Sequence, residues 1–457
     1  MNARERSDNM QKSMDMLQGS LWDKILKFSM PVAATAILEQ FFTATDVVIV
    51  GNFANGDKTA AMAAVGTDLQ IIALVIFLFL GLALGANVLI AQAIGRQNRE
   101  GVQKAVHTAV LLSVLAGIAV AVLGQFLAAP VLELMEIPPD VLPAAEMYLK
   151  IYFSGMPVIL LYNFEAAIFR SIGETQFPLK ALIVASLVNI VLDLFFVCVC
   201  KLDVTGVAIA TVIANVVCAF MLLYVLLKTE AAIRLEYSKL RIDMPVLQQI
   251  IQIGLPAGIQ SAVFNLANVV IQGAINSLGT KVIAASSASL LFEMVAYSIF
   301  SSFTQACTTF VGQNYGGRQL TRCRKILRLC LLEDGLCTGA CIIIMVCFGD
   351  KLIGLISDDS EVIILGYARA ATVFFAYIFS FAYDVMSGYM RGFGISFLPS
   401  VLTILGVCGV RLAWVAYVFP VHHDFQSLMY VYPVSLGVTA FLIFGALMWC
   451  RPTKRFS

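Results

Sequence analysis

The chain has 457 residues, of which 60% are hydrophobic and 13% are charged, and its mean hydropathy is +0.88. A soluble domain is nearer half apolar and a quarter charged, so this composition excludes a large soluble enzyme. The formal net charge of +1 offers no electrostatic basis for binding nucleic acid. The eleven cysteines are scattered through apolar runs, which predicts packing residues and neither a disulfide framework nor a zinc site.

Twelve apolar stretches follow a polar segment at 1–20, which lacks the apolar core of a cleavable signal peptide. Each is long enough to cross a bilayer as a helix, which takes about 20 residues. In the first half the predicted spans are 24–50, 60–93, 104–135, 143–170, 178–200 and 205–228. In the second half they are 246–277, 283–313, 325–349, 361–389, 396–418 and 426–450. The alternation of β-barrel strands is absent, so an all-α integral membrane protein is predicted.

Lysine and arginine predict the orientation of these spans, because cytoplasmic segments of membrane proteins are enriched in both. If the N-terminus is cytoplasmic, the basic residues gather in the inner segments. The outer loops then hold few of them: Lys58, Lys201, Lys281 and Lys351. We therefore expect a multi-pass protein of the plasma (inner) membrane with both termini in the cytoplasm.

An internal repeat relates the two halves. The string FRSIGETQFP at 169–178 returns as MRGFGISFLP at 390–399, with Arg, Gly and Pro each 221 residues further on, and Gly95 and Gly316 keep that offset. Each repeat holds six spans, so we expect two six-helix bundles related by a pseudo-two-fold axis along the membrane normal. The expected domains are a tail at 1–20, an N-lobe at 21–228, a linker at 229–245, a C-lobe at 246–450 and a tail at 451–457. Such bundles suit a transporter that alternates access by rocking.

Polar side chains inside the spans of the first repeat mark a candidate site, because ionisable groups are costly there. Asp46 and Glu165 are isolated acids, while Asn189 and Asp193 are four residues apart and share a helix face. Thr211 can add a hydroxyl. Together these oxygens predict binding of Na⁺ or of a proton. An ordinary interhelical hydrogen-bond network without an ion is the alternative.

The second repeat offers a different candidate site. Glu293 is followed at helical spacing by Met294, Tyr297 and Phe300, and an acid framed by aromatic rings and a thioether suits a lipophilic cation. Plain core packing is the alternative for these residues. A second hypothesis pairs Arg411 with a neighbouring acid such as Asp384.

These features resemble the multidrug and toxic compound extrusion (MATE) family over roughly residues 20–450. The resemblance rests on MPVAATAILEQFFTATDVVIVG in the first span, FRSIGETQFP after the fourth, VNIVLD in the fifth and GQNYGGR after the eighth. It implies a monomeric antiporter that exports organic cations and other drugs while Na⁺ or H⁺ enters, with no further cofactor.

The resemblance also implies roles for individual residues. Asp46, Asn189 and Asp193 match the family's N-lobe cation site, which Thr211 would join, and Glu293 matches an acid of the drug cleft in one bacterial branch. One departure concerns the seventh span. Its stretch QSAVFNLANVV lacks the acid that other members use for Na⁺, so coupling is expected to rest on the N-lobe.

Three other functions remain as alternatives. A lipid-linked saccharide flippase of the same superfamily would need a strongly cationic cavity. An intramembrane enzyme would need a catalytic motif, but His-Glu-x-x-His, Gly-x-Ser-x-Gly and the Walker sequence are all absent. A channel is disfavoured because a duplicated chain does not supply rings of identical charges.

Overall fold

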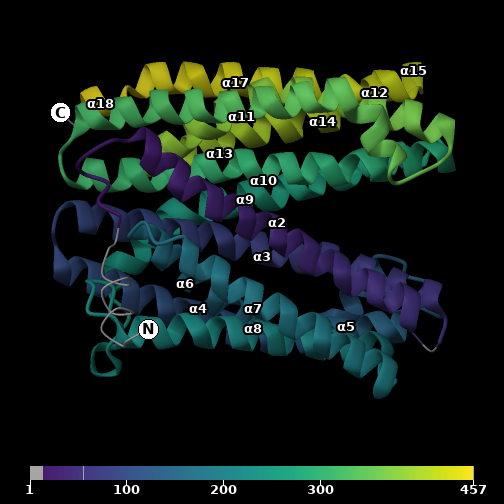
Figure 1. Cartoon of the computed structure of the whole chain (residues 1–457), viewed down its shortest axis with the longest axis horizontal. Coiled ribbons are helices and arrows are strands. Elements are labelled where there is room, and N and C mark those ends of the chain that lie inside the picture. The colour runs from purple at the N-terminus through teal and green to yellow at the C-terminus, as the bar shows by residue number, and fades with distance from the viewer. Residues whose placement is uncertain (1–13, 55, 456–457) are drawn as a thin grey trace. The chain divides into compact units, whose positions relative to one another are not determined.

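The computed structural model describes residues 14–54 and 56–455, and every regular element in that part of the chain is helical (Figure 1). The elements of the first repeat are α2 Trp22–Phe53, α3 Lys58–Gly95, α4 Arg99–Leu134, α5 Leu142–Ser154, α6 Met156–Ser171, α7 Gln176–Leu194, the π-helical η1 Phe195–Val199 and α8 Asp203–Lys228. A short 3-10 helix, η2 Tyr237–Lys239, lies in the linker.

The second repeat begins with four long helices, α9 Met244–Asn276, α10 Thr280–Gly316, α11 Leu320–Gly354 and α12 Ser360–Gly392. Its eleventh span alternates between α- and π-helical turns: α13 Phe397–Thr403, η3 Ile404–Gly409, α14 Val410–Ala413, η4 Trp414–Val418 and α15 Phe419–His422. It ends with α16 Phe425–Met429, α17 Val431–Cys450 and α18 Pro452–Arg455.

The predicted spans are confirmed. Within the described ranges, eleven helical segments are long and apolar enough to cross a membrane, and a bent pair brings the total to twelve. The bent pair is α5 with α6, which meet at 51° around Gly155. Pro157 follows and lacks a backbone N–H, and a Cβ at Gly155 would lie 2.6 Å from Val212. The break therefore lets the chain pass close to α8.

The chain forms two compact units. Thr35–Gly254 form the body of the first unit, while Met16–Ala34 and the chain from Leu255 onwards form the second. The predicted division kept the whole first span in the N-lobe and began the C-lobe at 246. In the structure α2 and α9 are instead each divided between the units, just after Pro31 and just before Pro256. Proline interrupts helical hydrogen bonding, which lets one helix follow two packing partners.

Local packing explains both divisions. In the second unit, the ring of Phe28 near the start of α2 packs edge-to-face on Phe310 of α10 at 5.7 Å. In the first unit, the start of α9 approaches α3 so closely that a Cβ on Gly85 would lie 2.5 Å from the carbonyl oxygen of Ile250. Glycine permits this backbone contact.

The linker is held to the first unit through α4. The backbone N–H of Glu236 donates to Nε2 of the buried His107 at 3.1 Å, and the N–H of Asp243 donates to Oγ1 of Thr108 at 3.0 Å. Outside the spans, the ammonium of Lys239 hydrogen-bonds to Glu236 and lowers the pKa of that carboxyl. The linker is thus anchored by side chains of one helix.

Both described ends of the chain lie at one end of the second unit. Arg322, near the start of α11, donates to the carbonyl oxygens of Gln18 and Gly19 at 3.0 Å each. Arg324 donates to Thr453 of α18 at 2.8 Å. An even number of crossings requires this arrangement, and the cytoplasmic orientation stays a prediction.

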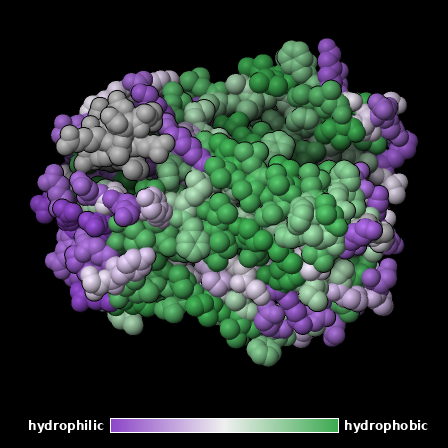
Figure 2. Space-filling view, turned by 60° about the horizontal axis from the view of Figure 1, so that its bottom comes forward, coloured by the Kyte–Doolittle hydropathy of each residue, from purple (hydrophilic) through white to green (hydrophobic). Residues whose placement is uncertain are grey.

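Hydrophobic side chains dominate the surface of the helices. In Figure 2 they cover the middle of the visible face, while hydrophilic residues gather towards two margins. Exposed rings include Phe126 and Phe220 in the first unit, and Phe375 and Phe441 in the second. An apolar band of this kind faces lipid hydrocarbon, which explains the composition.

Candidate functional site

The first unit gathers the four residues predicted to bind a cation from three helices. Asp46 of α2 is buried, and its Oδ2 accepts a hydrogen bond of 2.9 Å from Oγ1 of Thr211 on α8. Asn189 and Asp193, one turn apart on α7, are buried and act electrostatically on Asp46. The structure therefore brings together the four residues predicted to bind the cation. We call them the Asp46 cluster.

The Asp46 cluster has unused oxygens. Oδ1 of Asp46, both carboxylate oxygens of Asp193 and the amide of Asn189 make no hydrogen bond with any residue in the described ranges. Two neighbouring buried carboxylates repel each other and are costly to keep charged. A hard cation takes oxygen ligands, and a proton neutralises one carboxylate, so the donor set fits either Na⁺ or H⁺.

The backbone beside the cluster is irregular. Asp193 lies in the last turn of α7, and the π-helical η1 begins two residues later at Phe195. Single π-turns inside helices occur frequently at functional sites because they redirect the side chains around them.

Asp68 of α3 is an acid that our sequence reasoning missed. Its side chain is fully buried, and neither carboxylate oxygen has a hydrogen-bond partner among residues 14–54 and 56–455. The buried ring of Tyr148 on α5 interacts electrostatically with Asp46, Asp68 and Asp193. Asp68 therefore lies near the Asp46 cluster. The position of this acid inside the predicted apolar span 60–93 could have identified it from the sequence.

Two further acids of the first unit lie elsewhere. Glu165 of α6 is buried, and among the described residues its oxygens have no hydrogen-bond partner. It acts on Cys218 rather than on the Asp46 cluster. Glu39 of α2, also missed from the sequence, accepts a hydrogen bond of 3.3 Å from Tyr162 and interacts with Arg170.

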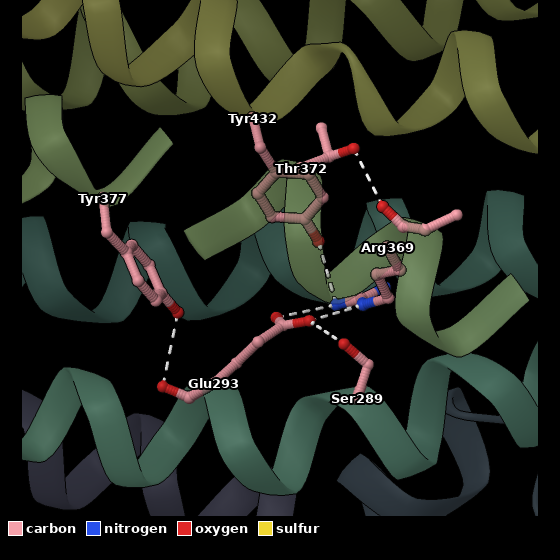
Figure 3. A network of polar contacts seen from close by, with 7 residues as sticks. Ser289, Glu293, Arg369, Thr372, Tyr377 and Tyr432 are labelled. Carbon is pink, nitrogen blue, oxygen red and sulfur yellow. Dashed lines mark hydrogen bonds and ion pairs between the residues drawn. The ribbon is translucent and has the colours of Figure 1, made fainter. Parts of the chain in front are cut away.

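In the second unit, Glu293 of α10 is held in a polar network (Figure 3). Arg369 of α12 donates from Nε to Oε1 at 2.7 Å and from Nη2 to Oε2 at 3.1 Å. Ser289 donates to the same Oε1 at 2.7 Å, and the hydroxyl of Tyr377 donates to the backbone oxygen of Glu293 at 3.3 Å. The carboxylate that was predicted to meet a cationic substrate is thus already paired with an arginine.

The four residues predicted to bind substrate differ in how far their side chains are exposed. Glu293 and Phe300 are buried, with Phe300 packed on Tyr377 at 5.1 Å, whereas Met294 and Tyr297 are 40% and 42% exposed. Helical spacing along α10 predicts a shared face. It cannot reveal that Arg369 arrives from α12 to cover the carboxylate.

Arg411 and Asp384 do not form the hypothesised pair. Arg411 instead donates to Oδ1 of Asn268 at 2.5 Å and to Oγ of Ser435 at 3.4 Å. The electrostatic partner of Asp384 is Arg391, seven residues further along α12, in the repeated string. The separation of Asp384 and Arg391 by two turns of one helix could have predicted this pair from the sequence.

Comparisons with known proteins match most of the chain. The sequence model of the MatE family matches residues 31–195 and 256–417. The chain is 26% identical over 452 residues to the probable multidrug resistance protein YoeA of Bacillus subtilis, covering 96% of each. It is 23% identical over 393 residues to the probable multidrug resistance protein NorM of Thermotoga maritima, covering 85% of this chain and 84% of the relative. The crystal structure of MATE in complex with MaL6 matches with a TM-score of 0.89 at 19% identity, covering 97% of this chain and all of that one.

Proposed function

We propose that this chain, which belongs to the MATE family of transporters, exports small-molecule drugs across the plasma membrane in exchange for Na⁺ or H⁺. Relatives named as multidrug resistance proteins support efflux of drugs as the overall function. The observation that carries cation exchange is the pair of buried acids, Asp46 and Asp193, with oxygens that no described residue satisfies.

Coupling follows if the cation and the drug prefer different states of the protein. Na⁺ or H⁺ bound at the Asp46 cluster stabilises the packing of α2 against α7 and α8, because it removes the repulsion between Asp46 and Asp193. A drug that prefers the other packing is then released outside. By thermodynamic linkage the drug displaces the cation on the inside. We place both termini in the cytoplasm and take the monomer as the transporting unit.

Organic cations are among the drugs that we expect to be exported. The exposed side chains of Met294 and Tyr297 offer adaptable apolar contacts, and Tyr297 interacts with the acid Asp384. A cation that paired with Glu293 would first have to displace Arg369. The exposed side chains of Met294 and Tyr297 therefore serve a cation better than the carboxylate of Glu293 does.

Ethidium efflux from pump-deficient bacteria tests the proposal. Cells that express the wild-type protein should export ethidium, and Asp46→Asn should abolish export while the protein remains in the membrane. Asp57→Asn is the matched control, since it removes an exposed carboxylate whose capping oxygen asparagine retains. Normal export by Asp46→Asn would refute the coupling role. Dependence of wild-type export on external Na⁺ would identify Na⁺ as the ion, and insensitivity to Na⁺ would identify H⁺.

A lipid-linked saccharide flippase is the second candidate. The observation that favours it is the set of buried arginines in the second unit, Arg369, Arg391 and Arg411. Two of them have acidic neighbours, Glu293 and Asp384, so only Arg411 is left without an acid, and one positive charge is less than a pyrophosphate would require. Flipping of a lipid-linked sugar in proteoliposomes, without ethidium export from cells, would reverse the order of the two candidates.

A further inference from the structure

Tyr432 of α17 joins two buried arginines in the second unit. The centre of its ring lies 5.5 Å from the guanidinium carbon of Arg369 and 4.8 Å from that of Arg411. Its hydroxyl also accepts a hydrogen bond of 3.3 Å from Nη2 of Arg369, as Figure 3 shows. The two positive charges therefore share one aromatic side chain.

Acidic groups neutralise only one of these charges. Glu293 forms a two-point ion pair with Arg369. Arg411, only 2% exposed, is bound by the neutral Asn268 and Ser435, and no acidic oxygen of a described residue lies within 4.0 Å of it. Asp384, the acid hypothesised to pair with Arg411, interacts with Arg391. The group of Glu293, Arg369, Arg411 and Tyr432, which we call the Tyr432 cluster, thus keeps one positive charge in excess.

A second observation points to a missing acceptor. Nη1 of Arg369 is buried and has no hydrogen-bond partner in the part of the chain that the structure describes. An unsatisfied buried donor on a charged group is costly, and an oxyanion would satisfy both this donor and the excess charge. The guanidinium of Arg411 also stacks on Phe264 of α9 at 5.1 Å, so aromatic surface flanks the charge.

The backbone at Arg411 is irregular in the same way as the backbone at Asp193. The π-helical η3 ends two residues before Arg411, and η4 begins three residues after it. Such turns mark functional sites frequently.

The repeat places the two clusters at matching positions. Tyr432 follows Thr211 by 221 residues, and Arg369 follows Tyr148 by the same offset. One repeat thus holds acids beside Tyr148 and Thr211, where the other holds excess positive charge.

We propose that the Tyr432 cluster is a binding site for organic anions, in which a carboxylate or phosphate group pairs with Arg411 and Arg369 while an attached aromatic ring contacts Phe264. Phe264 and Asn268 are partly exposed and one turn apart on α9, so a ligand approaches across them and displaces the Asn268 oxygen. The inference rests on the proposed function, since the site receives molecules for export, and it adds anions to the organic cations expected at Met294 and Tyr297.

Two dyes with the same xanthene core test the charge preference. Fluorescein is anionic and rhodamine 6G is cationic, so anisotropy titrations of the purified full chain in neutral detergent compare charge at nearly constant shape. Arg411→Gln should weaken fluorescein binding about tenfold or more, the effect of losing a hydrogen-bonded charge, and should leave rhodamine 6G binding unweakened. Arg411→Lys should retain most of the affinity. Arg451→Gln, which removes an exposed arginine after α17, should change neither.

A variant that is expected to strengthen fluorescein binding keeps the proposal testable if Arg411→Gln does not fold. Asn268→Ala removes the neutral competitor for Arg411 and should tighten fluorescein binding several-fold. Weaker or unchanged binding by folded Asn268→Ala, or unchanged binding by folded Arg411→Gln, would overturn the proposal.

Phosphatidylglycerol added to the micelles tests a lipid headgroup as the source of the anion. If the lipid protects wild-type protein against thermal unfolding in an Arg411-dependent way, yet fluorescein does not bind, the aromatic-anion assignment is wrong. Ethidium export by the same wild-type protein separates the two hypotheses. Export without fluorescein binding rejects only this inference, whereas absence of export rejects the proposed function.

Discussion

The buried ion pair of Glu293 and Arg369 predicts that replacing Arg369 alone strongly destabilises the protein. Replacing both residues should restore most of the stability. Arg369→Met removes two charge-assisted hydrogen bonds and leaves the carboxylate with Ser289 as its remaining side-chain donor. Breaking a buried ion pair by removing one partner costs about 3–5 kcal/mol. For a unit of this size 1 kcal/mol shifts the melting temperature by roughly 2–4 °C. We therefore expect Arg369→Met to lower the melting temperature by about 10 °C.

The double variant Glu293→Met/Arg369→Met should recover most of that loss, because apolar pairs of similar volume replace buried ion pairs at little net cost. Thermal unfolding of the purified full chain in detergent, followed by tryptophan fluorescence, measures both variants. Glu293→Met alone completes the double-mutant cycle. If the losses of the two single variants simply add in the double variant, the side chains do not interact and the pairing is refuted.

Three other predictions concern packing, the linker and Asp68. Gly85→Ala should destabilise the protein by about 1–3 kcal/mol, because its Cβ meets the Ile250 carbonyl, whereas Gly273→Ala on α9 has open space and should be neutral or stabilising in the same melts. His107→Ala should release the linker from α4, so limited trypsin digestion at 229–243 should accelerate relative to wild type, and an unchanged rate would contradict the anchoring role. Asp68→Asn should not lower the melting temperature, since it removes a buried charge that no described residue satisfies; a loss of several degrees would show that the carboxylate is stabilised after all.

The sequence could predict the features that depend on local composition. Twelve apolar stretches became the spans, and the i,i+4 spacing of Asn189 and Asp193 correctly placed both on one face, turned towards Asp46. Thr211, predicted to add a hydroxyl from the sixth span, donates to Asp46 in the structure. The shared face of Asn189 and Asp193 needed only helix geometry, whereas their grouping with Asp46 and Thr211 also rested on the resemblance to the MATE family.

The partners of charged residues depended on packing between helices, which the sequence does not state. Glu293 looked available to a substrate because its pairing with Arg369 spans α10 and α12, 76 residues apart. For the same reason, the sequence did not predict that Arg411 donates to Asn268 and Ser435 and not to an acid. The division of α2 was missed because Phe28 packs on Phe310, far along the chain.

Cation-dependent drug affinity tests the central claim most directly. In purified wild-type protein, the dissociation constant for ethidium should rise as Na⁺ is added or as the pH is lowered, whichever ion couples, because cation and drug favour different packings around Asp46. In Asp46→Asn the dissociation constant should stay flat across both titrations. The same rise in the variant as in the wild type would mean that the coupling cation binds elsewhere, and would contradict the account.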